Sequence, residues 1–336
     1  MMRKFDACTF YFDKDRGGEI CIRALGGRYF VLRPGTSTGL APFQLKPTPE
    51  NVAHVQQLVR AMVRTQNPFT ARESNEIDEA VAGVFSLSSG ERRMAHMLSF
   101  LDPPTQNNIA ARLLRWVASD RGEGPLAWVF DNARDGLDLE ASRLTGFDMT
   151  HFLDVPEIRT PMMMHLFHRI DGVKDGRRGA TIIDEGWKAL DDEVFEAGIG
   201  DSLKTDRKKN WLLGLITQSP KDTLASKVAH TISEQTATKI FMPNINARRE
   251  DYVNGLGTTE GVFDAIKGLA ENGRRMVIKQ GQNAVVAELD LGDFEDDIAI
   301  FSGTAANVAL LDRIRAKVGD DPEVWLPIFH RERKSA

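Results

Sequence analysis

The segment Ala180-Thr-Ile-Ile-Asp-Glu185 is a short apolar run that ends in two adjacent carboxylates. Apolar runs of this length, bounded by turn residues, are typical of strands buried in a parallel sheet. At the carboxyl end of such a strand, Asp184 would hold Mg²⁺ through water, and Glu185 would orient and deprotonate an attacking water. This is the arrangement of a Walker B site. The alternative is a solvated acidic pair at the end of a strand.

A second apolar run, Leu213-Gly-Leu-Ile-Thr-Gln218, ends in a polar amide. A sheet strand beside the Walker B strand of a RecA-like NTPase carries a polar residue that contacts the γ-phosphate and the catalytic water. Gln218 fits this sensor role, and Thr217 would lie beside it against the nucleotide. The alternative for Gln218 is a set of ordinary turn hydrogen bonds.

A basic run lies on the helix that we expect over residues 191–208, between the two strands. It includes Lys204 and Arg207. Arg207 would reach a phosphate in its own subunit or act as an arginine finger across a subunit boundary, and Lys204 would assist in nucleotide binding. The alternative is that these cations stay solvated and favour the helix dipole. Arg248 and Arg249 are weaker candidates for phosphate contact.

The rest of the chain alternates strand and helix patterns. The periodicity predicts an α/β core over residues 1–45 and 123–336, interrupted by an all-helical insertion over residues 46–122. In the first core part we expect a strand at 9–12 and a hairpin formed by 19–23 and 28–32. In the second part we expect strands at 126–130, 180–183, 211–217, 239–242 and 276–279, with 283–290 returning antiparallel to the last.

Composition excludes several classes of protein. The chain has 336 residues with a net charge of −5 and two cysteines, Cys8 and Cys21. The net negative charge disfavours binding of nucleic acid over the whole protein surface. Two cysteines are too few for a disulfide scaffold. No signal-peptide pattern occurs, and the apolar runs are far shorter than the ~20 residues that span a bilayer. These features predict a cytoplasmic, non-integral protein.

The sequence contains no Gly-x-x-x-x-Gly-Lys-Ser/Thr segment, whose backbone N–H groups would wrap the phosphates of a nucleotide. Residues Gly198–Thr205 come close, but Leu203 stands where the second glycine is needed. This segment also lies in a helical pattern and does not follow a strand. We therefore interpret it as part of a helix.

Several further segments complete the pattern: Phe12-Asp-Lys-Asp-Arg-Gly17, Arg23-Ala-Leu-Gly-Gly27, Phe130-Asp-Asn132, Gly146-Phe-Asp-Met149, Phe167-His-Arg169, Asp184-Glu-Gly-Trp187, Lys204-Thr-Asp-Arg-Lys208 and Thr217-Gln-Ser219. In this order, and through almost the whole chain, they resemble signatures of the type IV secretion ATPases of the CagE/TrbE/VirB class. The resemblance implies a RecA-like P-loop NTPase core of the FtsK/HerA type with an all-helical insertion. It also implies ATP and Mg²⁺ as cofactors.

The resemblance further implies partners and a location. Members of this class act as hexamers or dimer-derived assemblies and contact other secretion subunits and the coupling protein. They work at the cytoplasmic face of the bacterial inner membrane. In the family pattern a P-loop precedes the Phe-Asp-Lys-Asp-Arg-Gly strand, and here Asp13 stands close to Met1. We therefore expect a C-terminal motor portion without its first strand and P-loop, which hydrolyses little or no ATP alone.

Three functions remain open from the sequence. The first is a component of a motor ATPase, with Asp184 and Glu185 as Walker B, Gln218 as the sensor and Arg207 as an interface arginine. The second is a non-hydrolysing interaction module that binds secretion partners. The third is a DNA-pumping ATPase, for which DNA-stimulated hydrolysis with a steep salt dependence is expected.

Overall fold

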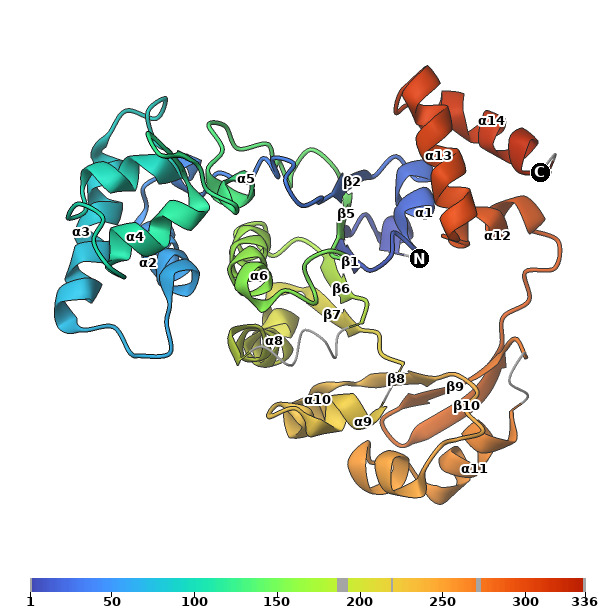
Figure 1. Ribbon diagram of the computed structural model, residues 1–336. Helices are drawn as coiled ribbons and strands as arrows, with labels where there is room; N and C mark the ends of the chain where they lie inside the picture. The colour runs from blue at the N-terminus through green and yellow to red at the C-terminus, as the bar shows by residue number, and fades with distance from the viewer. Residues whose placement is uncertain (1, 186–192, 219, 270–272, 335–336) are drawn as a thin grey trace. The chain divides into compact units, whose positions relative to one another are not determined.

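The computed structural model describes residues 2–185, 193–218, 220–269 and 273–334 (Figure 1). The chain divides into two compact units. The first comprises Met1–Tyr29, Ser142–Phe147 and Lys174–Ala336, and the second comprises Phe30–Ala141 and Asp148–Val173. The predicted insertion, residues 46–122, falls within the second unit, and its exact limits stay a prediction.

A five-stranded sheet with the order β2-β5-β1-β6-β7 carries the first unit. Its strands are β1 (Cys8–Asp13), β2 (Arg28–Val31), β5 (Leu144–Asp148), β6 (Gly179–Ile183) and β7 (Trp211–Leu215). Strands β1, β6 and β7 are parallel, with Phe12 opposite Ile183 and Ile183 opposite Leu215. The strands predicted at 9–12, 180–183 and 211–217 are thereby confirmed, and their carboxyl ends lie at one edge of the sheet.

A tight fit aligns β6 with β7. A Cβ atom on Gly179 would lie 2.0 Å from the Trp211 ring, so only glycine leaves room for this indole. The Trp211 side chain donates a hydrogen bond to the Thr181 hydroxyl at 2.9 Å and stacks on Phe10. These contacts fix the register of the strands that end at Asp13 and Asp184.

Helices α8 (Glu193–Thr205), α9 (Pro220–Ala225) and α10 (Ala229–Gln235) follow β6 and β7, with a 3-10 turn at Asp206–Lys209. Helix α8 contains residues 198–205, which confirms that the near-match to a P-loop is helical. The beginning of the helix predicted over 191–208 lies outside the described residues, as do Gly186, Trp187 and Ser219 of the family-like segments.

The strands predicted near 239–242, 276–279 and 283–290 form a sheet of their own, with the order β10-β9-β8. They are β8 (Thr238–Phe241), β9 (Arg275–Gln280) and β10 (Asn283–Glu288), and both pairings are antiparallel. A small core joins Phe241 and Val277 to residues of α11 (Glu260–Gly268). Figure 1 shows α11 beside this sheet. These strands are therefore separate from the five-stranded sheet, because β8 pairs with β9 and not with β7.

The C-terminal helices α12 (Glu295–Phe301), α13 (Ala305–Val318) and α14 (Pro322–Lys334) pack on α1 (Glu19–Ala24). Their apolar cluster includes Ile20, Leu311, Trp325 and Phe329. The fully buried Glu19 accepts hydrogen bonds from Arg16 at 2.5 Å and from Arg23 at 2.7 Å. The Arg315 guanidinium lies 3.7 Å from the same carboxylate. This network joins α1 to α13.

The second unit is mainly helical. It contains α2 (Pro49–Val63), α3 (Ala71–Ser86), α4 (Ile109–Leu113), α5 (Ala127–Phe130) and α6 (Pro156–Asp171), with 3-10 turns at Pro42–Gln44, Met94–Ser99 and Leu114–Trp116. The short strands β3 (Ala118–Ser119) and β4 (Gly122–Glu123) pair with each other. The Thr48 hydroxyl caps α2, as its place before Pro49 predicts.

Three histidines gather where α2 packs on α6. His54 lies 3.2 Å from His165 between ring nitrogens, and its ring stacks on that of His168 with centroids 3.8 Å apart. His168 is also hydrogen-bonded to the Asn51 side-chain oxygen, at 2.6 Å. His165 is completely buried and meets the edge of Phe130. This cluster lies within the second unit.

Two predicted strands are helices. Residues 19–23, expected in a hairpin, form α1, and residues 126–130 form α5 and the turn before it. A short apolar run fits a buried helix as well as a strand, so tertiary packing decides between them. Ile20 on α1 packs against α13 and α14, and the four residues of α5 are all buried.

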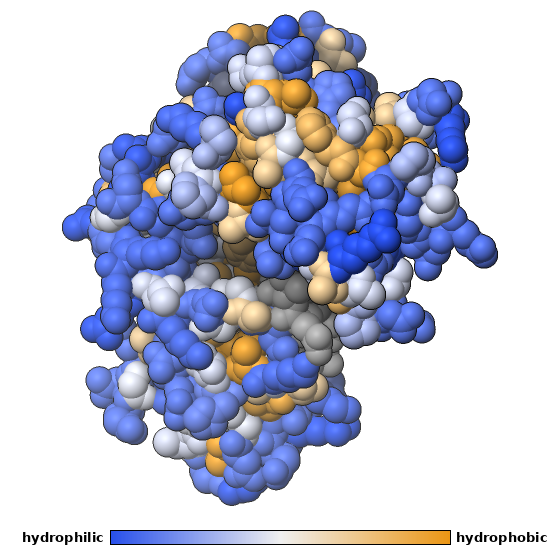
Figure 2. Space-filling view, turned by 90° about the vertical axis from the view of Figure 1, so that its left-hand side faces the viewer, coloured by the Kyte–Doolittle hydropathy of each residue, from blue (hydrophilic) through white to orange (hydrophobic). Residues whose placement is uncertain are grey.

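One face of the molecule is shown in Figure 2. On the face in Figure 2, hydrophilic residues predominate and apolar patches lie between them. Of the helices in the described ranges, none combines the length and the apolar composition that crossing a membrane requires.

Candidate functional site

Polar side chains follow three neighbouring parallel strands where the strands end. Asp13 is the last residue of β1, Asp184 and Glu185 follow β6, and Gln218 follows β7. Carboxyl ends of parallel strands share one edge of a sheet, and ligands of open α/β sheets bind outside this edge. The structure therefore brings together the predicted Walker B pair and the predicted sensor.

Glu185 is held directly by Gln218. The Gln218 side-chain amide donates a hydrogen bond to Glu185 Oε1 at 2.6 Å, which joins the ends of β6 and β7. The Glu185 side chain is only 7% exposed, and its backbone has a left-handed φ of 53°. Left-handed backbone is uncommon for residues other than glycine and is frequent at functional sites. The conformation turns the chain sharply directly after β6.

Asp184 continues the pairing between β6 and β1. Its backbone N–H donates to the Phe12 carbonyl at 2.9 Å, and its side-chain Oδ1 accepts from the Glu185 N–H at 3.0 Å. Burial raises the pKa of Asp184 above its usual range; the Glu185 N–H opposes this shift, and the negative charge of the Glu185 carboxylate adds to it. Lys14 opposes the shift as well.

The carboxylates of Asp184 and Asp13 contribute a negative electrostatic potential at Tyr11, near this edge. Burial raises the pKa of the Tyr11 hydroxyl, and the charges of Asp184 and Asp13 raise it further. A cation bound beside Asp184 would offset this potential.

Asp13 is a site residue that sequence reasoning missed. It is 1% exposed, and its Oδ2 accepts hydrogen bonds from the Tyr29 hydroxyl at 2.5 Å and from the Gly18 N–H at 2.9 Å. The carboxylate thus fixes the loop between β1 and α1 beside Asp184. Its position at the end of a predicted strand, like that of Asp184, was the signal available in the sequence.

A shallow hollow of about 210 Å³ opens beside Gln218. Arg248 lines it, together with Lys221, Asn244 and Asp251. Arg249 instead forms an ion pair with Glu260. Thr217 is exposed at the end of β7. The structure therefore places Arg248 and Thr217 near the sensor, whereas Arg249 is engaged elsewhere.

Lys204 and Arg207 do not join this site within one chain. Lys204 lies in the last turn of α8, and Arg207 lies in the 3-10 turn directly before β7. They precede the amino end of the strand whose carboxyl end leads to Gln218. The structure therefore places neither side chain beside Asp184 within one chain, and their part in nucleotide binding stays a prediction. Arg207 is exposed, so a role across a subunit boundary stays a prediction.

The arrangement can orient water and bind a cation through few protein ligands. Among the residues that the structure describes, no group of three or more His, Cys, Asp or Glu side chains could hold a metal ion. Mg²⁺ keeps several waters and is usually bound by one or two carboxylates plus substrate phosphates. Asp184, beside a second carboxylate in a negative potential, fits a metal held in this way.

Comparison with known proteins gives close relatives in sequence. The chain is 44% identical to the type IV secretion system protein virB4 of Bartonella quintana over 99% of its own length and 42% of the relative's. It is 40% identical to the type IV secretion system protein PtlC of Bordetella pertussis over 98% of its own length and 40% of the relative's. The chain thus spans about two fifths of the curated relatives that it matches. No model of a known protein family matches it.

Among solved structures, VirB4 of Thermoanaerobacter pseudethanolicus is similar with a TM-score of 0.67 at 15% identity, covering 86% of this chain and 83% of that one. The bacterial conjugative coupling protein TrwBdeltaN70 gives a TM-score of 0.50 at 13% identity, covering 86% and 79%. These likenesses confirm the predicted fold, an α/β core of the RecA-like NTPase type.

Proposed function

We propose that the chain is part of an ATP-hydrolysing motor of a type IV secretion system, because it belongs to the family of the VirB4 and PtlC proteins of such systems. The observation that carries this proposal is the hydrogen bond between Gln218 and Glu185 at the carboxyl ends of adjacent parallel strands. A sensor amide and a general base that act on one water must both lie within hydrogen-bond reach of that water, and this hydrogen bond brings the two side chains together.

Each residue of the site has a role in the proposal. Asp184 binds Mg²⁺ through water, and Glu185 orients the attacking water and takes its proton. Gln218 positions Glu185, and with Thr217 and Arg248 it faces the phosphate end of the nucleotide. When bound, Mg²⁺ neutralises charge that develops on the phosphates.

The phosphate-binding loop is supplied from outside this sequence. The P-loop pattern is absent from the 336 residues, and β7 is the last strand in the order of its sheet. Leu212 on β7 is 52% exposed, and Ile216 directly after it is 45% exposed, although both stand in an apolar run typical of an interior strand. A parallel strand added to this edge would deliver the loop that follows it beside Gln218.

The wider assembly follows from the family. We propose that the complete protein self-associates as a hexamer and contacts other secretion subunits and the coupling protein at the cytoplasmic face of the inner membrane. Arg207, exposed at the opposite edge of the sheet from Gln218, is the arginine that would reach a neighbouring subunit. A DNA contact would appear as DNA-stimulated hydrolysis that falls steeply with salt.

Titration calorimetry with Mg-ATP tests the role of the missing loop. We expect no detectable binding to the 336-residue chain, for which Asp184→Ala is the control. Binding that Asp184→Ala weakens would contradict the proposal, because it would require a phosphate cradle within this sequence.

Activity after joining the chain to a segment that carries the strand and P-loop tests catalysis. We expect ATP hydrolysis to appear and to fall by a factor of about 10²–10⁴ in Glu185→Gln, the range of a lost general base. If the joined protein still hydrolyses no ATP, this result would favour the second candidate, a non-hydrolysing interaction module. The absence of a P-loop pattern is the observation that favours that candidate.

A further inference from the structure

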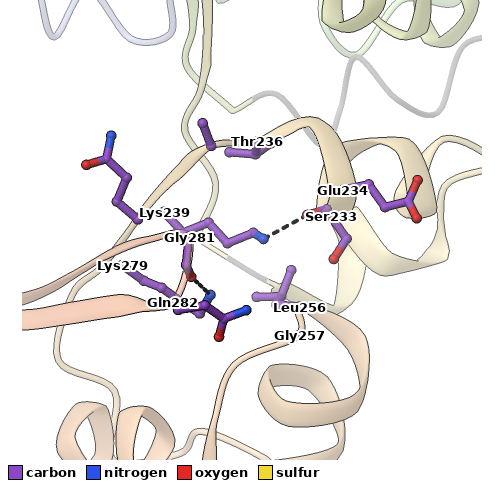
Figure 3. A pocket seen from close by; sticks show the side chains of 11 residues that line it. Ser233, Glu234, Thr236, Lys239, Leu256, Gly257, Lys279, Gly281 and Gln282 are labelled. Carbon is purple, nitrogen blue, oxygen red and sulfur yellow. Dashed lines mark hydrogen bonds between the residues drawn. The ribbon is translucent and has the colours of Figure 1, made fainter.

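A second hollow lies away from the strand-end site, on the β8–β10 sheet (Figure 3). It has a volume of about 370 Å³. Its walls come from the end of α10, from β8, from the β9–β10 turn and from the segment at Leu256 and Gly257. The polar lining consists of Ser233, Glu234, Thr236, Lys239, Lys279, Gln280 and Gln282.

Two lysines share this hollow in an arrangement that is unfavourable without a ligand. Lys239 on β8 and Lys279 on β9 stand directly opposite each other in the antiparallel register. Like charges in such a pair destabilise a sheet. The Lys239 ammonium donates to the Ser233 carbonyl at 2.8 Å, and the Lys279 ammonium donates to the Gly281 carbonyl at 2.6 Å. Across the described part of the chain, no carboxylate forms an ion pair with either.

We propose that this hollow binds the phosphate group of a small phosphorylated ligand through Lys239 and Lys279. A phosphate monoester carries nearly two negative charges and three acceptor oxygens, so it matches two adjacent ammonium groups. The hydroxyls and amides of Ser233, Thr236 and Gln282 provide further donors on the walls. The volume falls within the roughly 300–1,000 Å³ of small-molecule sites, so more than the phosphate fits.

The electrostatics of the hollow agree with this assignment. Burial lowers the pKa of Lys239, and the positive charge of Lys279 lowers it further. An anion bound between the two would oppose both effects. Glu234 also lines the hollow, but its side chain is 59% exposed and its carboxylate lies 3.4 Å from His230. It therefore stands at the rim.

Binding can be followed by NMR of the lysine side-chain methylene groups, with inorganic phosphate and glucose 6-phosphate as separate probes. We expect saturable shifts for Lys239 and Lys279. Lys239→Gln and Lys279→Gln should each weaken binding about tenfold. The control is Lys317→Gln, which removes the same charge from an exposed position on α13. If glucose 6-phosphate binds more tightly than inorganic phosphate, the ligand of the hollow is a small phosphomonoester. If the two probes bind equally, the ligand is the free phosphate ion.

Thermal unfolding separates a binding role from a structural one. Without phosphate, Lys279→Gln should raise the melting temperature, because it removes one of two opposed like charges. With phosphate, the unchanged protein should gain more in melting temperature than Lys279→Gln does. The proposal is overturned if neither probe gives saturable shifts, or if Lys317→Gln weakens binding as much as the two lysine variants in the hollow.

Discussion

Glu185, the proposed general base, has an unusual backbone conformation. Its carboxylate is fixed by the Gln218 amide, and its φ of 53° lies in the left-handed region. For residues with a Cβ atom this region costs roughly 1–2 kcal/mol. A glycine would adopt the turn more easily, but it would remove the carboxylate. We therefore expect the left-handed backbone at this position to be retained, because the proposed function needs the Glu185 carboxylate.

A pair of substitutions measures this strain. Glu185→Gly and Glu185→Ala both lose the hydrogen bond from Gln218, but only glycine relieves the left-handed backbone. We expect Glu185→Gly to be more stable than Glu185→Ala by about 1 kcal/mol in urea unfolding. Equal stabilities would show that the turn costs nothing in the folded protein.

The meeting of Asp184, Glu185 and Gln218 could be predicted from the sequence, whereas their chemical roles stay predictions. Strand ends are visible in the sequence, so Asp184, Glu185 and Gln218 could be expected to meet at one edge of the sheet. Arg207 lies just before the amino end of β7, whereas Gln218 follows the carboxyl end. The basic run alone does not reveal this separation. Asp13 was missed because its partners, Tyr29 and Gly18, lie beyond its own strand.

At the scale of elements, β7 has the composition of an interior strand at the edge of its sheet. Its neighbour on one side is β6, and it is the last strand in the order. Exposed edges with apolar side chains template association with other chains. The 336-residue chain alone is therefore expected to self-associate through β7.

Leu212→Lys should reduce this self-association, because a charge on an edge strand disfavours pairing with another strand. The side chain is 52% exposed, so we expect the free energy of unfolding to change by only about 0.5 kcal/mol. Sedimentation velocity over a range of concentrations measures the effect. Val324→Lys on α14, where the side chain is 45% exposed, is the matched control. Equal effects of the two variants would indicate association by surface hydrophobicity in general.

Long periodic helices could be predicted, whereas short apolar segments could not. α2 has its cap and a full apolar stripe in the sequence. α1 and α5 were expected as strands, because a run of four to six residues does not distinguish the two periods. The separate β8–β10 sheet was missed because strand patterns do not reveal which strands pair.

At the scale of the whole molecule, the cluster of His54, His165 and His168 is expected to make the second unit sensitive to acid. Burial lowers the pKa of His54 to about 3, and the charges of His168 and Arg169 act in the same direction. Burial likewise lowers the pKa values of His165 and His168, although Asp171 opposes the shift of His168. The folded unit thus holds these rings neutral, whereas the unfolded chain takes up protons below about pH 6.5.

Stability should therefore fall as the pH drops from 6.5 towards 3, by about 1.4 kcal/mol per pH unit from His54 alone. Hydrogen exchange followed by mass spectrometry should show the second unit opening before the first. His54→Asn should flatten this dependence, whereas His151→Asn, an exposed position in the same unit, should leave it unchanged. Equal acid sensitivity of both units would argue against the cluster as the cause.

The buried Glu19 carries a consequence for the evolution of such chains. Its carboxylate contacts the guanidinium groups of Arg16, Arg23 and Arg315, so one side chain ties together positions near the two ends of the sequence. A lineage that loses Glu19 removes the carboxylate that the three guanidinium groups share, although Asp312 still pairs with Arg16 and Asp320 with Arg315. A lineage that loses the arginines leaves a buried anion. These four positions should therefore covary across aligned homologues, and an exchange of sign at one should be accompanied by compensating replacements at the others.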